Sequence, residues 1–212
     1  MKKYGFTLAE ILITLGIIGV VAALTMPSLI HKQRNKALEA QFKKTYSMLA
    51  QVLLRVSVDE PDFYNDITGM NSVSGAITKL KPALIKYMNV AKDYNNKDYI
   101  DTLQEKYTNY DGKLPLADAS WGYVGQFVLS DGTMIFTECT SMCTPAIIIA
   151  DLTGPEKGPN RAGYDLFAFA IGSKMELLPY KRGDSEDKAS RFYGFSNAEK
   201  ALSEPDYFKN LP

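Results

Sequence analysis

The residue types that most often carry chemistry are scarce in this chain. Of its 212 residues, one is a histidine, His31, and two are cysteines, Cys139 and Cys143. A zinc site built from Cys and His ligands needs four such residues, so the chain alone excludes one. No nucleophile elbow, phosphate-binding loop or dinucleotide motif is present, and no serine and acid are placed to serve His31 as a catalytic base. We therefore expect no enzyme activity.

The two cysteines are four positions apart, and their pairing depends on the backbone between them. In a continuous strand their Cα atoms would lie about 13 Å apart, which is too far for a disulfide. The residues 140–142, Thr-Ser-Met, can supply the turn that a disulfide needs. We expect a disulfide between Cys139 and Cys143, with two buried or free thiols as the alternative.

Length and charge limit the classes of protein that remain. A chain of 212 residues has room for one ordinary domain and a separate helical or membrane element. Lys and Arg total 24, and Asp and Glu also total 24, so the formal net charge is zero. No global positive field attracts the chain to nucleic acid, and we expect no nucleic-acid partner.

The N-terminal segment is the most unusual part of the sequence. Phe6 to Ile30 is a run of 25 residues with a single charge, Glu10. As a helix it would extend about 37 Å, enough to cross a hydrocarbon core of about 30 Å. A carboxylate in such a segment costs on the order of a few kcal/mol unless it is paired, protonated or close to the membrane surface. We therefore expect a membrane helix in which Glu10 is compensated.

The N-terminal sequence resembles the N-terminus of type IV prepilins and type II secretion pseudopilins. The resemblance lies in the basic leader Lys2-Lys3-Tyr4-Gly5, then Phe6-Thr7-Leu8-Ala9-Glu10, then the apolar run that follows. It implies that prepilin peptidase cuts between Gly5 and Phe6 and that Phe6 is then N-methylated. It also implies an inner-membrane assembly platform and other pilin or pseudopilin subunits as partners.

Glu10 would then serve assembly. Cleavage leaves an ammonium at Phe6, and staggered helices in a filament could place it beside Glu10 of a neighbouring subunit. Such an ion pair in lipid would offset the cost of burying both charges. The rival interpretation is an ordinary signal peptide cut after Val21-Ala22-Ala23, which would release a domain that begins near Leu24.

The distribution of positive charge conflicts with a cytoplasmic N-terminus. Only Lys2 and Lys3 precede the apolar segment. Five cations follow it, namely Lys32, Arg34, Lys36, Lys43 and Lys44. A simple positive-inside count would therefore reverse the orientation. We give the prepilin motif more weight and place the head on the periplasmic or extracellular side of the inner membrane.

Beyond the apolar segment the pattern predicts a continuing helix. Apolar residues recur at steps of three and four, at Leu38, Phe42, Tyr46, Leu49, Leu53 and Val56. Pro27 predicts a kink or local loosening near residues 23–27. The predicted organisation is a leader at 1–5, a membrane and assembly helix at 6–30, an amphipathic second half at 31–58 and a globular head at 59–212.

The head is predicted to be α+β, with an antiparallel sheet packed on the second half of the long helix. Helices are predicted at 76–90 and 97–107, and a polar tail at 181–212 with a short helix near 197–203. A hairpin turn is predicted at 130–132. The predicted strands are 123–129, 133–137, 146–152, 165–171 and 175–179.

A second resemblance concerns a loop in the head. Residues 151–167 are similar to a loop frequent in pseudopilins, some of which bind calcium in the head. This resemblance implies Asp151, Glu156, Asn160 and Asp165 as oxygen ligands, a donor type that Ca²⁺ accepts. The alternative is that Asp151 and Asp165 cap turns by accepting hydrogen bonds from backbone N–H groups. We otherwise expect no cofactor.

The sequence as a whole predicts a structural subunit of a type IV pilus or a type II secretion pseudopilus. The alternative is a minor pilin, or a membrane-tethered module, whose head binds a surface or a macromolecule. Its candidate binding residues are tyrosines, although we expect most of them to be buried. They are Tyr87, Tyr94, Tyr99, Tyr107 and Tyr110.

Overall fold

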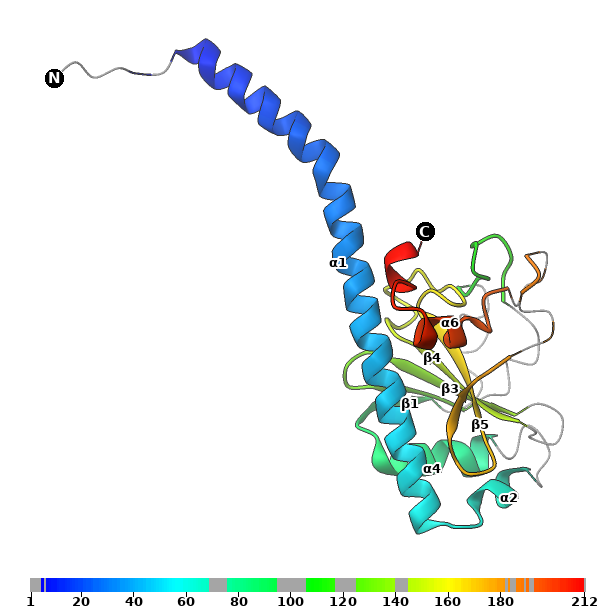
Figure 1. Cartoon of the computed structure of the whole chain (residues 1–212). Coiled ribbons are helices and arrows are strands. Elements are labelled where there is room, and N and C mark those ends of the chain that lie inside the picture. The colour runs from blue at the N-terminus through cyan, green and yellow to red at the C-terminus, as the bar shows by residue number, and fades with distance from the viewer. Residues whose placement is uncertain are drawn as a thin grey trace.

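One long helix extends far beyond the head that it supports (Figure 1). The structure is a computed structural model that describes residues 5, 7–68, 76–94, 106–116, 125–139, 145–181, 183, 186–188, 190 and 193–211. The helix, α1, spans Leu8–Asp59, and its second half lies along a six-stranded antiparallel sheet. The predicted α+β class, with a long N-terminal helix packed on an antiparallel sheet, is confirmed.

The bounds of α1 follow from its end residues. Thr7 caps the N-terminus, and at the other end the N–H of Glu60 donates to the carbonyl of Val56 before Pro61 prevents continuation. The helix is unbroken across Pro27, where we predicted a kink or loosening, and Figure 1 shows a curve in the half that projects from the head.

The two halves of α1 differ in burial. From Leu8 to Ile30 its large apolar side chains are exposed, whereas the second half buries one stripe against the head. This stripe matches the predicted apolar spacing closely. Its buried residues are Asn35, Leu38, Phe42, Thr45, Leu49, Val52, Leu53 and Val56.

The sheet is a simple meander. Its strand order is β1-β2-β3-β4-β5-β6, and each neighbouring pair is antiparallel. The strands are β1 Val90–Tyr94, β2 Gly125–Leu129, β3 Met134–Cys139, β4 Ala146–Asp151, β5 Leu166–Ile171 and β6 Leu177–Pro179. The predicted strands thus match β2 to β6 within a few residues, and the hairpin turn at 130–132 joins β2 to β3.

The prediction of one helix from 76 to 90 is wrong at its C-terminal end. A π-helical turn, η1 Ala76–Leu80, leads into α4 Lys81–Tyr87, and the chain then becomes strand β1. β1 is an edge strand with three exposed central residues, so it lacks the alternating apolar pattern that marks a half-buried strand. β1 is a strand because its backbone pairs with β2. The predicted helix at 97–107 lies mostly outside the described residues, and Tyr107 is not helical.

Both faces of the sheet are covered. Side chains alternate along each strand, so Ile148 and Phe167 face the core under α1, while Ile147 and Phe136 face a second core. β4 is buried along its whole length because it lies between these two cores.

The C-terminal segment completes the core under α1. Short elements α2 Phe63–Thr68, α6 Asn197–Ser203 and η4 Phe208–Asn210 surround the sheet, and α6 coincides with the predicted short helix. Phe208 is 3% exposed and packs against Phe42 of α1 with the two rings tilted and their centroids 5.4 Å apart. The end of the chain is therefore anchored to the helix, despite the polar composition of residues 181–212.

Candidate functional site: the N-terminal helix and its junction with the head

The first turn of α1 is a reciprocal capping box. The carboxylate Oε2 of Glu10 accepts hydrogen bonds from the backbone N of Thr7 at 2.7 Å and from its Oγ1 at 2.8 Å. The N–H of Glu10 in turn donates to Thr7 Oγ1 at 3.3 Å. The capping role of Thr7 was not predicted from the sequence, although Thr-x-x-Glu before an apolar run is the known signature of this cap.

One carboxylate oxygen of Glu10, Oε1, accepts no hydrogen bond from the described residues. Both hydrogen bonds from Thr7 go to Oε2, and no described residue donates to Oε1. Gly5 is exposed, whereas Phe6 lies outside the described residues, so the structure does not test the predicted cleavage and methylation at this bond.

The apolar half of α1 is long enough to cross a membrane. It contains a stretch of 18 residues that is strongly apolar and none of which is buried. Within this half, Gly16 and Gly19 have open space where a side chain would begin. Small residues of this kind allow helix backbones to approach closely in a membrane or a helical bundle.

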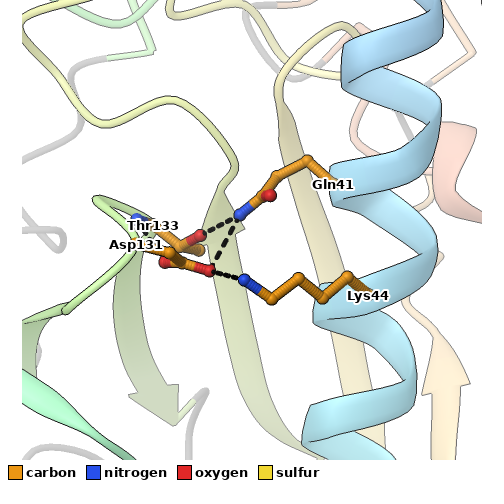
Figure 2. Close-up of polar contacts among 4 residues, drawn as sticks. All are labelled: Gln41, Lys44, Asp131 and Thr133. Atoms are coloured by element: carbon orange, nitrogen blue, oxygen red, sulfur yellow. Dashed lines mark hydrogen bonds and ion pairs between the residues drawn. The ribbon is translucent and has the colours of Figure 1, made fainter.

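Among the described residues, several polar contacts fasten the head to α1, and two of them lie at connections between strands. Figure 2 shows the first, where Gln41 and Lys44 of α1 reach Asp131 and Thr133 of the β2–β3 turn. Lys44 Nζ lies 2.6 Å from Asp131 Oδ2, and Gln41 Nε2 donates to Thr133 Oγ1 at 2.7 Å. Partial burial alone would raise the pKa of Asp131, but the hydrogen bonds that its carboxylate accepts from Lys44, Thr133 and Gln41 lower it to about 2.

The second fastening point lies nearer the apolar half of α1. Arg34 donates from Nη2 to the carbonyl of Gly158 at 3.0 Å, and its guanidinium lies over the ring of Tyr164. This arginine therefore docks the loop between β4 and β5 against the helix.

That loop contains the residues for which calcium binding was predicted, and the structure brings three of the four together. Asp151, Asn160 and Asp165 are all buried. Asp151 Oδ1 accepts from the backbone N of Thr153 and of Gly154, at 3.0 and 2.9 Å. Glu156 is exposed instead and pairs with Lys106 at 2.6 Å.

The remaining carboxylate oxygens also have donors. Asp151 Oδ2 accepts from the hydroxyl of Tyr107 at 2.7 Å. Asp165 accepts from the backbone N of Asn160 through Oδ2 and from that of Arg161 through Oδ1. The turn-capping arrangement that we weighed as the alternative to calcium ligation is therefore present.

Burial changes the protonation of this pair of carboxylates. Desolvation, followed by repulsion from Asp165, raises the pKa of Asp151 to about 7. Desolvation also raises the pKa of Asp165. Among the described residues, no group of three or more Asp, Glu, His or Cys side chains is placed to hold a metal ion. Calcium binding stays a prediction.

The disulfide also stays a prediction. Cys139 is the last residue of β3, but its side chain and Cys143 lie outside what the structure describes.

The tyrosines proposed for surface binding are largely engaged within the head. Tyr107 is buried, Tyr110 packs edge-on against Tyr193 and Tyr87 donates to Asp59. The ring of Tyr94 lies under the ammonium of Lys92. Tyr99 lies outside the described residues.

Comparison with known proteins identifies a family motif in the same N-terminal segment that the structure leaves exposed. The family described as the prokaryotic N-terminal methylation motif matches residues 1–26. No curated protein and no solved structure gives a significant match to the chain. The matched residues include the leader, the capping box at Thr7 and Glu10, and most of the exposed apolar helix. The chain thus carries the N-terminal signature of type IV pilins and pseudopilins.

Proposed function

We propose that this protein is a structural subunit of a type IV pilus or a type II secretion pseudopilus. In this proposal, prepilin peptidase cuts after Gly5, Phe6 becomes the methylated N-terminus, and α1 drives assembly. Before assembly the subunit is held in the inner membrane by residues 6–30, with its head on the periplasmic side. The proposal includes no catalytic activity.

The observation that carries this proposal is the uncovered apolar half of α1 directly behind the methylation motif. Its large side chains, from Leu8 to Ile30, are exposed, and no described residue of the head packs on them. A surface of this kind requires lipid or other apolar helices as its surroundings. A subunit that moves from a membrane into a filament exchanges one of these environments for the other, so the net change in apolar exposure is small.

Because apolar burial changes little during assembly, polar and close-packing contacts must fix the register between subunits. The capping box suggests how Glu10 does so. Its Oε2 remains bound to Thr7 within the subunit, while Oε1 is available for the Phe6 ammonium of a neighbour. Cleavage after Gly5 leaves the Thr7 amide intact, so the cap survives processing. Gly16 and Gly19 then allow neighbouring helices to approach.

The direct test is the N-terminus and intact mass of the protein isolated from its native membranes. The expected result is a chain that begins at N-methylated Phe6. A chain that begins near Leu24 would instead show release by signal peptidase, and one that retains Met1 would show a permanent anchor. Either of these results contradicts the proposal.

A further inference from the structure

A groove lies where the apolar half of α1 meets the head. Its volume is about 270 Å³, and it is formed by α1 and by the C-terminal turn η4. The side of the groove formed by η4 contains Phe208 and Lys209, and Figure 1 shows this part of the chain lying beside α1. The residues of α1 that line it are Leu29, His31, Lys32, Gln33, Asn35, Lys36 and Glu39.

If α1 spans the membrane with Ile30 at the edge of the hydrocarbon core, the groove begins in the layer of lipid headgroups and extends to its outer edge. The apolar segment ends at Ile30, and at 1.5 Å per residue Lys32 and Lys36 lie about 3 Å and about 9 Å beyond it. The polar headgroup layer extends about 5 to 8 Å beyond the hydrocarbon core on each side. Toward the N-terminus, α1 exposes the apolar side chains of Leu24, Met26 and Leu29, along which acyl chains could lie.

Of the five cations that follow the apolar segment, three make contacts with other described residues that account for their charge, and two do not. Arg34 docks the β4–β5 loop, Lys43 pairs with Glu39 and Lys44 pairs with Asp131. For Lys32 and Lys36 no acidic partner lies within ion-pair distance among the described residues, and both are exposed and line the groove. Lys209 adds a third positive charge, although Asp206 lies 2.5 Å from it.

A second, independent observation also indicates a ligand in this groove. Asn35 lines it and is 3% exposed, yet its side-chain oxygen has no hydrogen-bond partner among the residues that the structure describes. Its Nδ2 makes a long contact of 3.5 Å with His31 Nδ1. A buried amide oxygen without a donor costs about 1 to 3 kcal/mol. A hydroxyl of a ligand in the groove would supply a donor for this oxygen.

We propose that this groove binds the headgroup of an acidic phospholipid that carries free hydroxyls. The phosphate contacts Lys32 and Lys36, a headgroup hydroxyl donates to Asn35, and the start of the acyl chains packs on Leu29. This inference rests on the membrane placement in the proposed function and adds a lipid preference to it. The site would hold the head at a fixed height above the membrane before the subunit is extracted.

The test uses the full chain, purified in detergent, and two lipid probes, dioleoylphosphatidylglycerol and dioleoylphosphatidylcholine. Binding is measured by native mass spectrometry and by the lipid-dependent shift of the melting temperature. We expect the wild-type chain to prefer phosphatidylglycerol. Removal of two cations in K32Q/K36Q should weaken this binding about 10-fold or more.

A charge-neutral variant separates a specific site from general attraction to an acidic surface. N35L removes the amide without changing net charge, and we expect about 5-fold weaker phosphatidylglycerol binding. Without lipid, N35L should be at least as stable as the wild type, because an unpartnered polar group is replaced by an apolar one of similar size. The matched control is T45V, which removes another buried, unpartnered oxygen of α1 outside the groove and should bind lipid like the wild type.

Three kinds of result would overturn the proposal. The first is a lipid measurement without the expected difference, which means equal binding of both lipids or wild-type binding by N35L. The second is an equal thermal shift with inorganic phosphate or glycerol 3-phosphate, which would show a site for soluble anions. The third is a change in self-association of K32Q/K36Q with an unchanged lipid preference, which would assign the groove to contacts between subunits.

Failure of the lipid proposal can be distinguished from failure of the proposed function. Lipid preference is measured on the purified full chain, whether or not it has been cut after Gly5. The proposed function fails on the N-terminus found in native membranes, and the lipid proposal fails on the probe comparison.

Discussion

Lys44 of α1 and Asp131 of the β2–β3 turn form an ion pair at 2.6 Å between positions 87 residues apart in the chain. The same carboxylate accepts from Gln41 and caps its own turn by accepting from the N–H of Thr133. The turn between two strands is thereby attached to the helix that carries the head. Substitutions at these residues therefore test how much this contact stabilises the head.

We expect D131A to lower the free energy of unfolding by about 1 to 3 kcal/mol, because it removes the ion pair, the Gln41 contact and the turn cap together. K44Q should cost less than about 1 kcal/mol, since the Lys44 side chain is 56% exposed and its charge is screened by water. Chemical denaturation of the full chain in detergent measures both changes.

The matched control for this pair is K43Q, which removes an exposed lysine paired with Glu39 within α1. Its effect should stay within about 0.5 kcal/mol. Equal losses in K43Q and D131A would contradict a specific role of the turn. Because the pKa of Asp131 is lowered to about 2, its contribution is present above about pH 4 and is lost as the pH falls toward 2.

For Glu10, we expect E10A to enter the membrane normally and fail to assemble. E10Q gives a sharper test, because glutamine can maintain the capping box while it lacks the charge that would pair with the Phe6 ammonium. Both variants should therefore yield membrane protein without filaments, as seen by electron microscopy and membrane fractionation. Normal filaments from E10Q would refute the ion pair and leave the cap as the sole role of Glu10.

The buried carboxylate of Asp151 predicts a pH dependence of stability. Its pKa is about 7 in the folded chain and 3.8 for an ordinary aspartate, so between these values the folded state retains a proton that the unfolded state has lost. The free energy of unfolding should therefore decrease as the pH rises from about 4 to about 7. In D151N this decrease should be smaller, because the neutral amide can still accept from Thr153 and Gly154. An unchanged slope in D151N would assign the pH dependence to another group.

Calcium removal gives a separate test of the same loop. Every carboxylate oxygen of Asp151 and Asp165 already accepts a hydrogen bond from an N–H or O–H group. We therefore expect EGTA to leave the melting temperature unchanged. A decrease of several degrees that CaCl₂ restores and MgCl₂ does not would instead support the calcium site implied by the resemblance.

The C-terminal anchor should be energetically important. F208A removes a ring that packs on Phe42 and Phe167, and we expect a loss of about 3 to 5 kcal/mol in the free energy of unfolding. The control is L202A on α6, a residue that is 40% exposed, with an expected effect within about 0.5 kcal/mol. Similar stability of the two variants would show that the C-terminal segment contributes little to the core.

Elements with strong apolar patterns were predictable from the sequence. The stripe of α1 and the unbroken apolar runs of β4 and β5 are such patterns, and their bounds agree with the structure within one or two residues. The prepilin-like motif was also readable, because its residues are contiguous and their order is specific.

Apart from the local cap at Thr7, the features that were missed depend on contacts distant in sequence. β1 reads as polar because it lies at the sheet edge, where backbone pairing with β2 rather than side-chain burial defines the strand. Phe208 stands among polar residues, so only the position of Phe42 reveals its role. Glu156 was grouped with Asp151 because both belong to the loop that resembles one in pseudopilins, whereas its side chain pairs with Lys106.

The packing of Phe42 against Phe208 also has a consequence for synthesis. Phe42 leaves the ribosome before Phe208, which lies 166 residues further along the chain. If α1 enters the membrane during translation, as the proposed function implies, it does so before the ring that completes its packing exists. Until Phe208 has been synthesised, the core under α1 stays open on that side.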